Sequence, residues 1–276
     1  MSRSAQYRLV GTTHTISSYV ERCSTRFREY SPCQVDAPGT FWYHSHNRGQ
    51  YPDGLRGPLI VKDPWTPFAQ KYSSEIVLTL SDWYHEQMPT LTSGYLFGGG
   101  AEPEPYSALF NDAQNVQLRV QPSTTYMIRL INMAAFSQLF VRFEQHNLTI
   151  IEVDGVYTQP RTVQDLYVAV GQRYSVLLTT KSASTQNYAI LGMMDVNKYD
   201  SVPSSVNPYV TGSLVYNTAA TIPRPTIGTD YPTTINAFNI IDDFTLSPYD
   251  QVQLLTGSFM QIVLNLGFFP QDGQGR

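Results

Sequence analysis

The residues of this sequence best suited to chemistry are two histidines, His44 and His46, in the aromatic segment GTFWYHSH at 39–46. The residue types predict a β-strand over Thr40–His46, and residues two apart in a strand point to the same face. Neutral imidazole is a good ligand for copper and zinc. The spacing therefore predicts a shared metal site, although such pairs also occur on ordinary protein surfaces.

The composition favours an all-β fold. Of the 276 residues, 42% are hydrophobic, 13% are aromatic and only 14% are charged, and 18 Gly and 18 Pro supply turns. The net charge of −4 gives no reason to expect nucleic acid or an anionic membrane as a partner. No apolar run is long enough to span a membrane, and the N-terminal residues lack the apolar stretch of a signal peptide.

Short apolar or alternating runs separated by turn residues predict a cupredoxin-like Greek-key β-sandwich or barrel. The expected strands are Thr40–His46, Gly57–Lys62, Glu75–Trp83, Val116–Val120, Thr124–Asn132, Leu139–Phe143, Leu148–Val153, Leu166–Val170, Tyr174–Thr179, Tyr188–Met193 and Gly212–Tyr216. The polar turn at 144–147 predicts a hairpin between the strands on either side of it, and Asp154-Gly155 predicts a second tight turn. Residues 218–236, rich in Thr, Pro and Ala, are expected to form an extended linker.

The segment GTFWYHSH, followed by GQYPDGLRGPLIV at 49–61, resembles a copper-ligand segment of the multicopper oxidase family, which includes laccases and ferroxidases. The match is long and rich in distinctive residues. In that family the segment is the second of four His-x-His motifs, and its histidines serve the type 3 copper pair of a trinuclear cluster. The resemblance implies that His44 and His46 are type 3 copper ligands and that copper is the cofactor.

Laccase-type members of the family contain three cupredoxin domains, and the resemblance implies a fragment of that arrangement. Residues 34–63 are similar to the C-terminal part of the first domain, and residues 64–220 are similar to the complete second domain. Residues 221–276 resemble the linker and the start of a truncated third domain, which would include the apolar segment at 238–249. Residues 1–33 form a leader that does not match.

Two further segments resemble those of fungal iron-transport ferroxidases. The segment FEQHNLTIIEVDG at 143–155 places Glu144 at the position of an iron-binding carboxylate, and DVNKYDSVP at 195–203 places Asp200 at a second one, with Asp195 nearby. Carboxylate oxygens prefer ferric over ferrous iron, which favours electron loss. The resemblance implies a ferroxidase that couples oxidation of Fe²⁺ to reduction of O₂ to water. A laccase-like oxidase of small phenols is the alternative.

The numbers of His and Cys residues support an alternative in which the chain is not an active enzyme. A complete family member needs four His-x-His pairs and a His-Cys-His segment, whereas this sequence has five His, two Cys and no His-Cys-His segment. The alternative is a catalytically inactive, truncated cupredoxin fragment, and activity would require the missing domains or a longer chain. The family implies an extracellular or cell-surface location and an iron permease as partner of intact members. Whether Cys23 and Cys33 pair is left open by the sequence.

Several other polar residues have structural interpretations. We expect His85 and His146 to be structural, and Asp53 and Arg56 to hold the loop that follows the histidine pair. The tripeptide Asn147-Leu148-Thr149 fits the acceptor sequence for N-glycosylation. It lies in an apolar, strand-like run, so we expect it to be partly buried.

Overall fold

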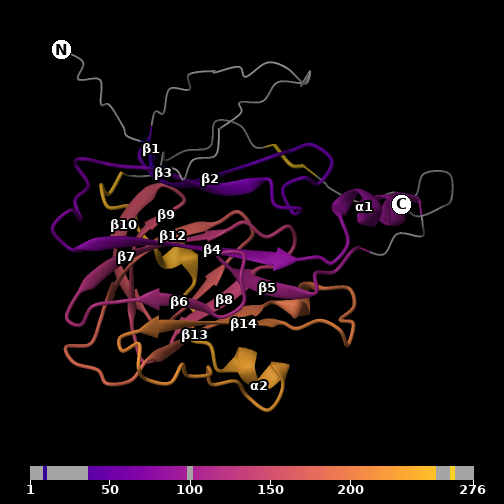
Figure 1. The fold of residues 1–276 in the computed structure, drawn as a ribbon. Helices are drawn as coiled ribbons and strands as arrows, with labels where there is room; N and C mark the ends of the chain where they lie inside the picture. Colours follow the sequence, from indigo (N-terminus) through magenta and orange to yellow (C-terminus); the bar gives the residue numbers. More distant parts are fainter. Residues whose placement is uncertain (1–8, 11–36, 98–101, 253–261, 265–276) are drawn as a thin grey trace, which may run out of the picture.

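Three β-sheets stacked in layers form the framework of the part of the chain that the structure describes (Figure 1). The computed structural model describes residues 9–10, 37–97, 102–252 and 262–264. The outer sheet has the strand order β1 (Leu9–Val10), β3 (Arg56–Val61) and β2 (Gly39–His44). The middle sheet has the order β10 (Val156–Val163), β9 (Leu148–Val153), β12 (Arg173–Thr179), β7 (Thr125–Asn132), β4 (Ser74–Trp83) and β5 (Ser107–Phe110). The third sheet has the order β11 (Asp165–Val168), β8 (Leu139–Phe143), β13 (Tyr188–Met194), β14 (Tyr209–Val215) and β6 (Val116–Arg119).

The main hydrophobic core lies between the middle and third sheets. Each strand turns alternate side chains toward the facing sheet, as in other β-sandwiches. In β12, Tyr174, Val176 and Leu178 point into this core, whereas Ser175 and Leu177 point the other way, toward the outer face of the middle sheet. The all-β sandwich predicted from the sequence is confirmed.

The expected strands are present, with small differences at their ends, but the sequence analysis missed several elements. Strand β10 was missed because its sequence VYTQPRTV is polar and contains Pro160. The structure accommodates this proline where the pairing register with β9 shifts, between Tyr157 and Arg161. Strands β1 and β5 are short. The helical elements that were also missed are α1 (Met88–Phe97), α2 (Tyr231–Asn236) and the single turns η1 (Val196–Lys198) and η2 (Asp243–Thr245).

The predicted hairpin between β8 and β9 is wrong, because the two strands belong to different sheets. Strand β8 pairs with β11 and β13, whereas β9 pairs with β10 and β12. Phe143 and Leu148, at the two ends of the connection, are both buried in the same core. The chain therefore crosses from one layer of the sandwich to the other, with Gln145 at a φ of 57° in the turn. Sequence alternation alone does not distinguish this crossing from a hairpin.

The predicted turn at Asp154-Gly155 is confirmed as a two-residue hairpin loop between β9 and β10. Both residues have positive φ, 52° and 84°, which suits the loop type favoured by Asp-Gly. A Cβ added to Gly155 would lie 2.8 Å from the ring of Phe41 in β2. The glycine therefore also permits close approach of the outer sheet to the middle one.

The segment expected to be an extended linker contains α2, in which the Asp230 side chain accepts a hydrogen bond from the backbone N–H of Thr233. The following residues pack back on the sandwich, since Phe238 contacts Phe140 and the Tyr174 hydroxyl donates to Asp243 at 2.6 Å.

Both cysteines and most of the expected leader lie outside the described residues. Within the described ranges, no helix combines the length and apolarity needed to cross a membrane.

Candidate metal site

His44 and His46 lie close together at the end of β2. The strand ends at His44, so His46 stands just beyond it, yet the two imidazole centroids are only 4.5 Å apart. Trp42 also stacks on His44, with ring centroids 4.1 Å apart. Trp42, His44 and His46 therefore share one face, as the two-residue spacing predicts. His44 is half-buried and His46 is exposed.

The loop that follows the pair is held by its own hydrogen bonds. The backbone N–H of Ser45 donates to the carbonyl of Leu55 at 3.1 Å, which closes the loop at its base. Asp53 accepts from the backbone N–H of Met88 at 3.0 Å. Arg56 donates to the carbonyl of Tyr51 at 2.6 Å and pairs with an Asp112 carboxylate oxygen at 3.0 Å. The structural roles expected for Asp53 and Arg56 are confirmed.

A buried polar network fixes β2 against the middle sheet, at Thr40 near the other end of the strand. The backbone N–H of Thr40 donates to Glu152 Oε1 at 2.7 Å, and its Oγ1 lies 2.8 Å from Ser175 Oγ. Arg129 donates to Thr40 Oγ1 at 2.6 Å, and Arg173 donates to the Thr40 carbonyl at 3.0 Å. Thr40 thus binds to strands β9, β12 and β7 at once, and the position of the histidine pair follows from this anchor.

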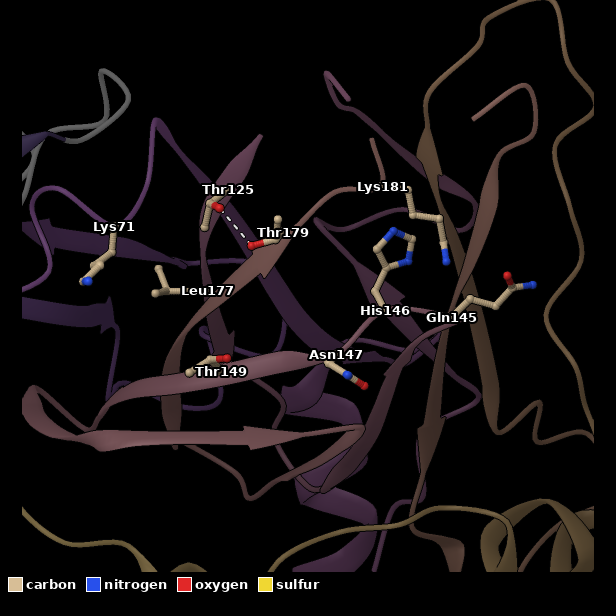
Figure 2. A pocket seen from close by; sticks show the side chains of 9 residues that line it. All are labelled: Lys71, Thr125, Gln145, His146, Asn147, Thr149, Leu177, Thr179 and Lys181. Atoms are coloured by element: carbon tan, nitrogen blue, oxygen red, sulfur yellow. Dashed lines mark hydrogen bonds between the residues drawn. The ribbon is translucent and has the colours of Figure 1, made fainter. Parts of the chain in front are cut away.

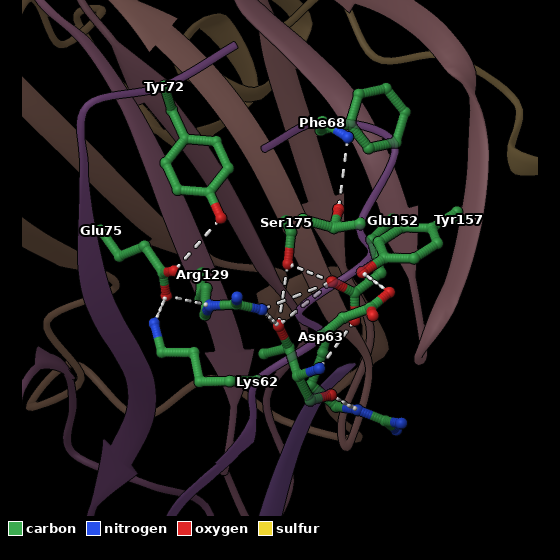
Figure 3. A network of polar contacts seen from close by, with 12 residues as sticks. Lys62, Asp63, Phe68, Tyr72, Glu75, Arg129, Glu152, Tyr157 and Ser175 are labelled. Carbon is green, nitrogen blue, oxygen red and sulfur yellow. Dashed lines mark hydrogen bonds and ion pairs between the residues drawn. The ribbon is translucent and has the colours of Figure 1, made fainter. Parts of the chain in front are cut away.

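Charge balance explains why the network can be buried. Glu152 is 2% exposed, and its carboxylate accepts from Ser175 Oγ at 2.7 Å and lies 3.5 Å from the Arg129 guanidinium (Figure 3). Arg129 also donates to Glu75 at 2.9 Å, and Lys62 pairs with the same Glu75 carboxylate. Burial alone would raise the pKa of Glu75, but the hydrogen bonds from Arg129 and Lys62 hold it below its ordinary value.

The histidine pair fits copper in the type of its donors and supplies part of a ligand set. Copper binds imidazole well, and a protein copper site uses three or more side-chain ligands. In the part of the chain with described coordinates, no group of three or more His, Cys, Asp or Glu is placed to hold a metal ion. His44 and His46 would therefore share a metal with ligands beyond those that the described residues provide.

The structure does not bring Glu144 together with Asp195 and Asp200. The backbone N–H of Glu144 donates to the carbonyl of Ala189 at one end of the β8–β13 pair, whereas Asp195 N–H donates to Gln138 at the other end. The intervening five residues of strand correspond to about 17 Å. Asp200 follows at the Asp195 end. One iron ion bound by Glu144 and Asp200 together does not fit this geometry.

Each of the three carboxylates has different surroundings. Glu144 is half-buried and accepts a hydrogen bond from the backbone N–H of Thr226 in the segment before α2. Asp195 is buried, accepts from the Tyr167 hydroxyl at 2.9 Å, and caps the helical turn η1. Asp200 is exposed. Of the three, Asp200 has the carboxylate most open to a ligand.

The structure places another carboxylate beside Asp200. Glu104 accepts from both the backbone N–H and the hydroxyl of Ser201, at 3.2 and 2.7 Å. Glu102, two residues earlier, is exposed. These residues were not predicted from the sequence, although the pattern AEPEP at 101–105, two acids separated by proline, was a signal that could have identified them.

His146 is buried, and both of its ring nitrogens have partners. Nδ1 lies 2.8 Å from the carbonyl of Glu144, and Nε2 lies 2.7 Å from the Tyr216 hydroxyl. A carbonyl can only accept, so Nδ1 carries the proton and Nε2 accepts from Tyr216. Burial lowers the pKa of His146, and the positive charge of Lys181 adds to this effect. The structural role expected for His146 is confirmed.

His85 is exposed, and it lies beside aromatic residues. Its Nδ1 accepts from the Trp83 indole N–H at 3.3 Å, and its ring centroid is 4.4 Å from that of Tyr106. These contacts orient the His85 side chain.

Comparison with known proteins settles the family. Models of multicopper oxidase domains match residues 74–219 and 25–66, so the second match begins inside the expected leader. The chain belongs to the multicopper oxidase family. It is 43% identical to an iron transport multicopper oxidase of Gibberella zeae and 38% identical to one of Saccharomyces cerevisiae, over 84% and 77% of this chain.

Solved structures agree with this assignment. The crystal structure of Fet3p, described as a multicopper oxidase that functions in iron import, superposes with a TM-score of 0.74 at 36% identity, over 80% of this chain and 41% of that one. A laccase from Botrytis aclada gives a TM-score of 0.60 at 30% identity, over 71% of this chain and 38% of that one. The multicopper oxidase described here spans 37% and 33% of the lengths of the two curated relatives.

The anchor at Thr40 predicts a stability effect. Replacing Thr40 with Val keeps the shape of the side chain but removes the hydroxyl that Arg129 and Ser175 contact. Leaving these buried groups short of a partner should lower the free energy of unfolding by about 2–3 kcal/mol, measured by urea denaturation. Thr125→Val is the matched control, because its hydroxyl pairs with Thr179 in an exposed position. Equal effects of the two substitutions would contradict the anchoring role.

The burial of His146 predicts a pH dependence of stability. Its pKa in the folded protein lies below the unfolded value of about 6.5. As the pH falls through 6.5, the unfolded chain takes up a proton that the folded protein resists, so the stability supplied by neutral His146 is lost. The advantage of the wild type over His146→Gln, measured by urea unfolding, should therefore shrink from pH 7 to pH 5. The exposed His85→Gln serves as control, and a constant difference for His146→Gln would contradict the interpretation.

Proposed function

We propose that this chain is part of a ferroxidase that couples oxidation of Fe²⁺ to reduction of O₂ to water during iron uptake. The observation that carries the proposal is the pair His44/His46, with ring centroids 4.5 Å apart on one face, in a chain similar to iron transport multicopper oxidases. Since the chain spans about a third of these relatives, the remaining ligands would come from further domains of a longer chain.

In this proposal His44 and His46 hold copper of the type 3 pair. Copper, when bound, would take electrons from the substrate and deliver them to dioxygen. The residues of this chain contribute the orientation of the ligands: Trp42 stacks on His44, and the base of the following loop is closed between Ser45 and Leu55. The Thr40 anchor holds the strand that carries His44.

We assign iron binding to one exposed and one half-buried carboxylate, because hard oxygen ligands stabilise ferric over ferrous iron. Asp200 and Glu144 are the proposed residues. Their positions at opposite ends of β8 and β13 support separate contributions, and Glu104 adds a carboxylate near Asp200. The neighbouring carboxylate is consistent with a cationic substrate at the Asp200 end.

A laccase-like oxidase of small phenols is the second candidate. It is favoured by the similarity to the Botrytis aclada laccase, with a TM-score of 0.60. The catalytically inactive fragment is the third, and the incomplete ligand set of the described residues supports it. The location that goes with the ferroxidase is extracellular or at the cell surface, with an iron permease as the partner of the intact protein.

Copper binding tests the assignment of the histidine pair. The chain loaded with Cu²⁺ should bind the metal through His44 and His46, and the substitution of either by Ala should weaken the affinity measured by calorimetry about tenfold or more. His85→Ala, which removes another exposed imidazole, should bind as the wild type does. No intense thiolate-to-copper absorption should develop. Undiminished binding by both variants, or a strong blue band, would overturn the assignment.

The intact mass of the protein purified from its source separates an active enzyme from a fragment. A species well above the 31.1 kDa of this chain would identify a longer product that contains the missing ligands. Agreement with 31.1 kDa would favour the inactive fragment.

Substitution of the carboxylates in that longer protein tests the substrate. Asp200→Ala and Glu144→Ala should each lower kcat/KM for Fe²⁺ and leave phenol oxidation unchanged. Because one iron ion does not reach both residues, each substitution should remove only the share of iron oxidation that its own end supports, and the double variant should lose about tenfold or more of kcat/KM. Glu86→Ala removes an exposed carboxylate elsewhere and serves as control. Unchanged iron oxidation in the double variant would reject the ferroxidase site.

A further inference from the structure

We propose that Asn147 carries an N-linked glycan, which stands at the end of the middle sheet farthest from the Thr40 anchor. Asn147-Leu148-Thr149 is the only match to the acceptor sequence in the 276 residues. The expectation that it would be partly buried is wrong for the asparagine. Asn147 is exposed and lies in the loop just before β9, whereas Leu148 is fully buried.

The local geometry presents the Asn147 side chain to solvent. His146 on one side and Leu148 on the other are held in the protein, at 6% and 0% exposure. The chain is extended as it enters β9, where successive side chains point in opposite directions, so anchoring of these neighbours turns Asn147 outward. Among the described residues, none hydrogen-bonds to its amide. A modification at Nδ2 would therefore displace no contact of the fold.

A polar groove beside Asn147 provides a surface for the sugars. The cavity has a volume of about 380 Å³, and Figure 2 shows its lining side chains. Hydroxyl and amide groups predominate, including Thr125, Thr179 and Gln145, and the lining also contains Lys71 and Lys181. Such groups can donate to and accept from sugar hydroxyls. The groove thus suits a carbohydrate that begins at Asn147 better than it suits an apolar ligand.

The position of the groove is compatible with the packing of the outer sheet. Ser175, Leu177 and Thr179 lie on the same face of β12. Ser175 contacts Thr40, Leu177 packs against the cluster that contains Phe68, and Thr179 lines the groove. The four-residue step from Ser175 to Thr179 is about 13 Å of strand. A glycan at Asn147 would therefore lie beside the covering segment at Lys71, about 13 Å along the strand from the contact of Ser175 with β2.

The chemistry is transfer of an oligosaccharide from a polyprenyl diphosphate in the secretory pathway. Asn147 Nδ2 forms a bond to the anomeric carbon, the bond from that carbon to the diphosphate oxygen breaks, and the diphosphate leaves with the electron pair. One amide proton passes to a base of the transferase. Thr149 supplies the hydroxyl that the acceptor sequence requires; in the folded protein this hydroxyl lies 3.1 Å from that of Thr162.

The test uses the full chain, directed to the secretory pathway of a fungal host by an added signal peptide. Digestion with a peptide N-glycosidase in H₂¹⁸O should lower the intact mass by one glycan and convert Asn147 to ¹⁸O-labelled Asp, located by peptide mass spectrometry. Thr149→Ser keeps the acceptor sequence and should keep the glycan. Thr149→Ala and Asn147→Gln should lose it. An unmodified Asn147 in the secreted wild type, or a glycan retained by Thr149→Ala, would overturn the proposal.

The peptide map of the wild type decides the matter even if a variant fails to fold. The proposal rests on the secretory location proposed above, and the added signal peptide keeps the two separate. Absence of a glycan after forced secretion rejects the site at Asn147. A glycan in this host, together with an unmodified protein at its natural source, rejects the secretory location instead.

Discussion

The buried carboxylate of Glu152 is the constraint on which the position of the histidine pair depends. A charge that is 2% exposed must be paired and hydrogen-bonded, or burial costs several kcal/mol. Its partners come from three elements: the backbone N–H of Thr40, the hydroxyl of Ser175 and the guanidinium of Arg129. If β2 moved, Glu152 would lose a donor and Arg129 an acceptor. The strand that carries His44 is therefore held in one position against the middle sheet.

Both faces of the middle sheet therefore make packing contacts with another sheet. Toward the third sheet it is a conventional sandwich layer, with Tyr174, Val176 and Leu178 in the core. Toward the outer sheet it is polar at Ser175 and apolar at Leu177. The hydrogen bonds at Ser175 fix the position of β2 on the middle sheet, because hydrogen bonds are directional. The packing at Leu177 buries apolar surface but does not fix that position. Together they hold the segment that carries His44 and His46 against the middle sheet.

Much of the fold and part of the site could be predicted from local pattern. Strand β12 alternates core and outer-face residues, and Trp42, His44 and His46 share a face, as a two-residue period requires. Two expectations drawn from the sequence failed for the same reason. The β8–β9 connection looked like a hairpin, and Glu144 looked like a companion of Asp200, because neither pattern contains information about which sheet a strand joins or at which end of it a loop lies.

The sequence by itself determined most of the strands, the shared face of His44 and His46, and membership of the multicopper oxidase family. These depend on residue types and on spacing within a few positions. The tertiary structure alone decided the anchor between Thr40 and Glu152, 112 residues apart, the separation of Glu144 from Asp200, and the exposure of Asn147. These depend on contacts between strands of different layers. Such contacts depend on packing and hydrogen bonding throughout the sandwich. The residue pattern within a single strand carries no information about them.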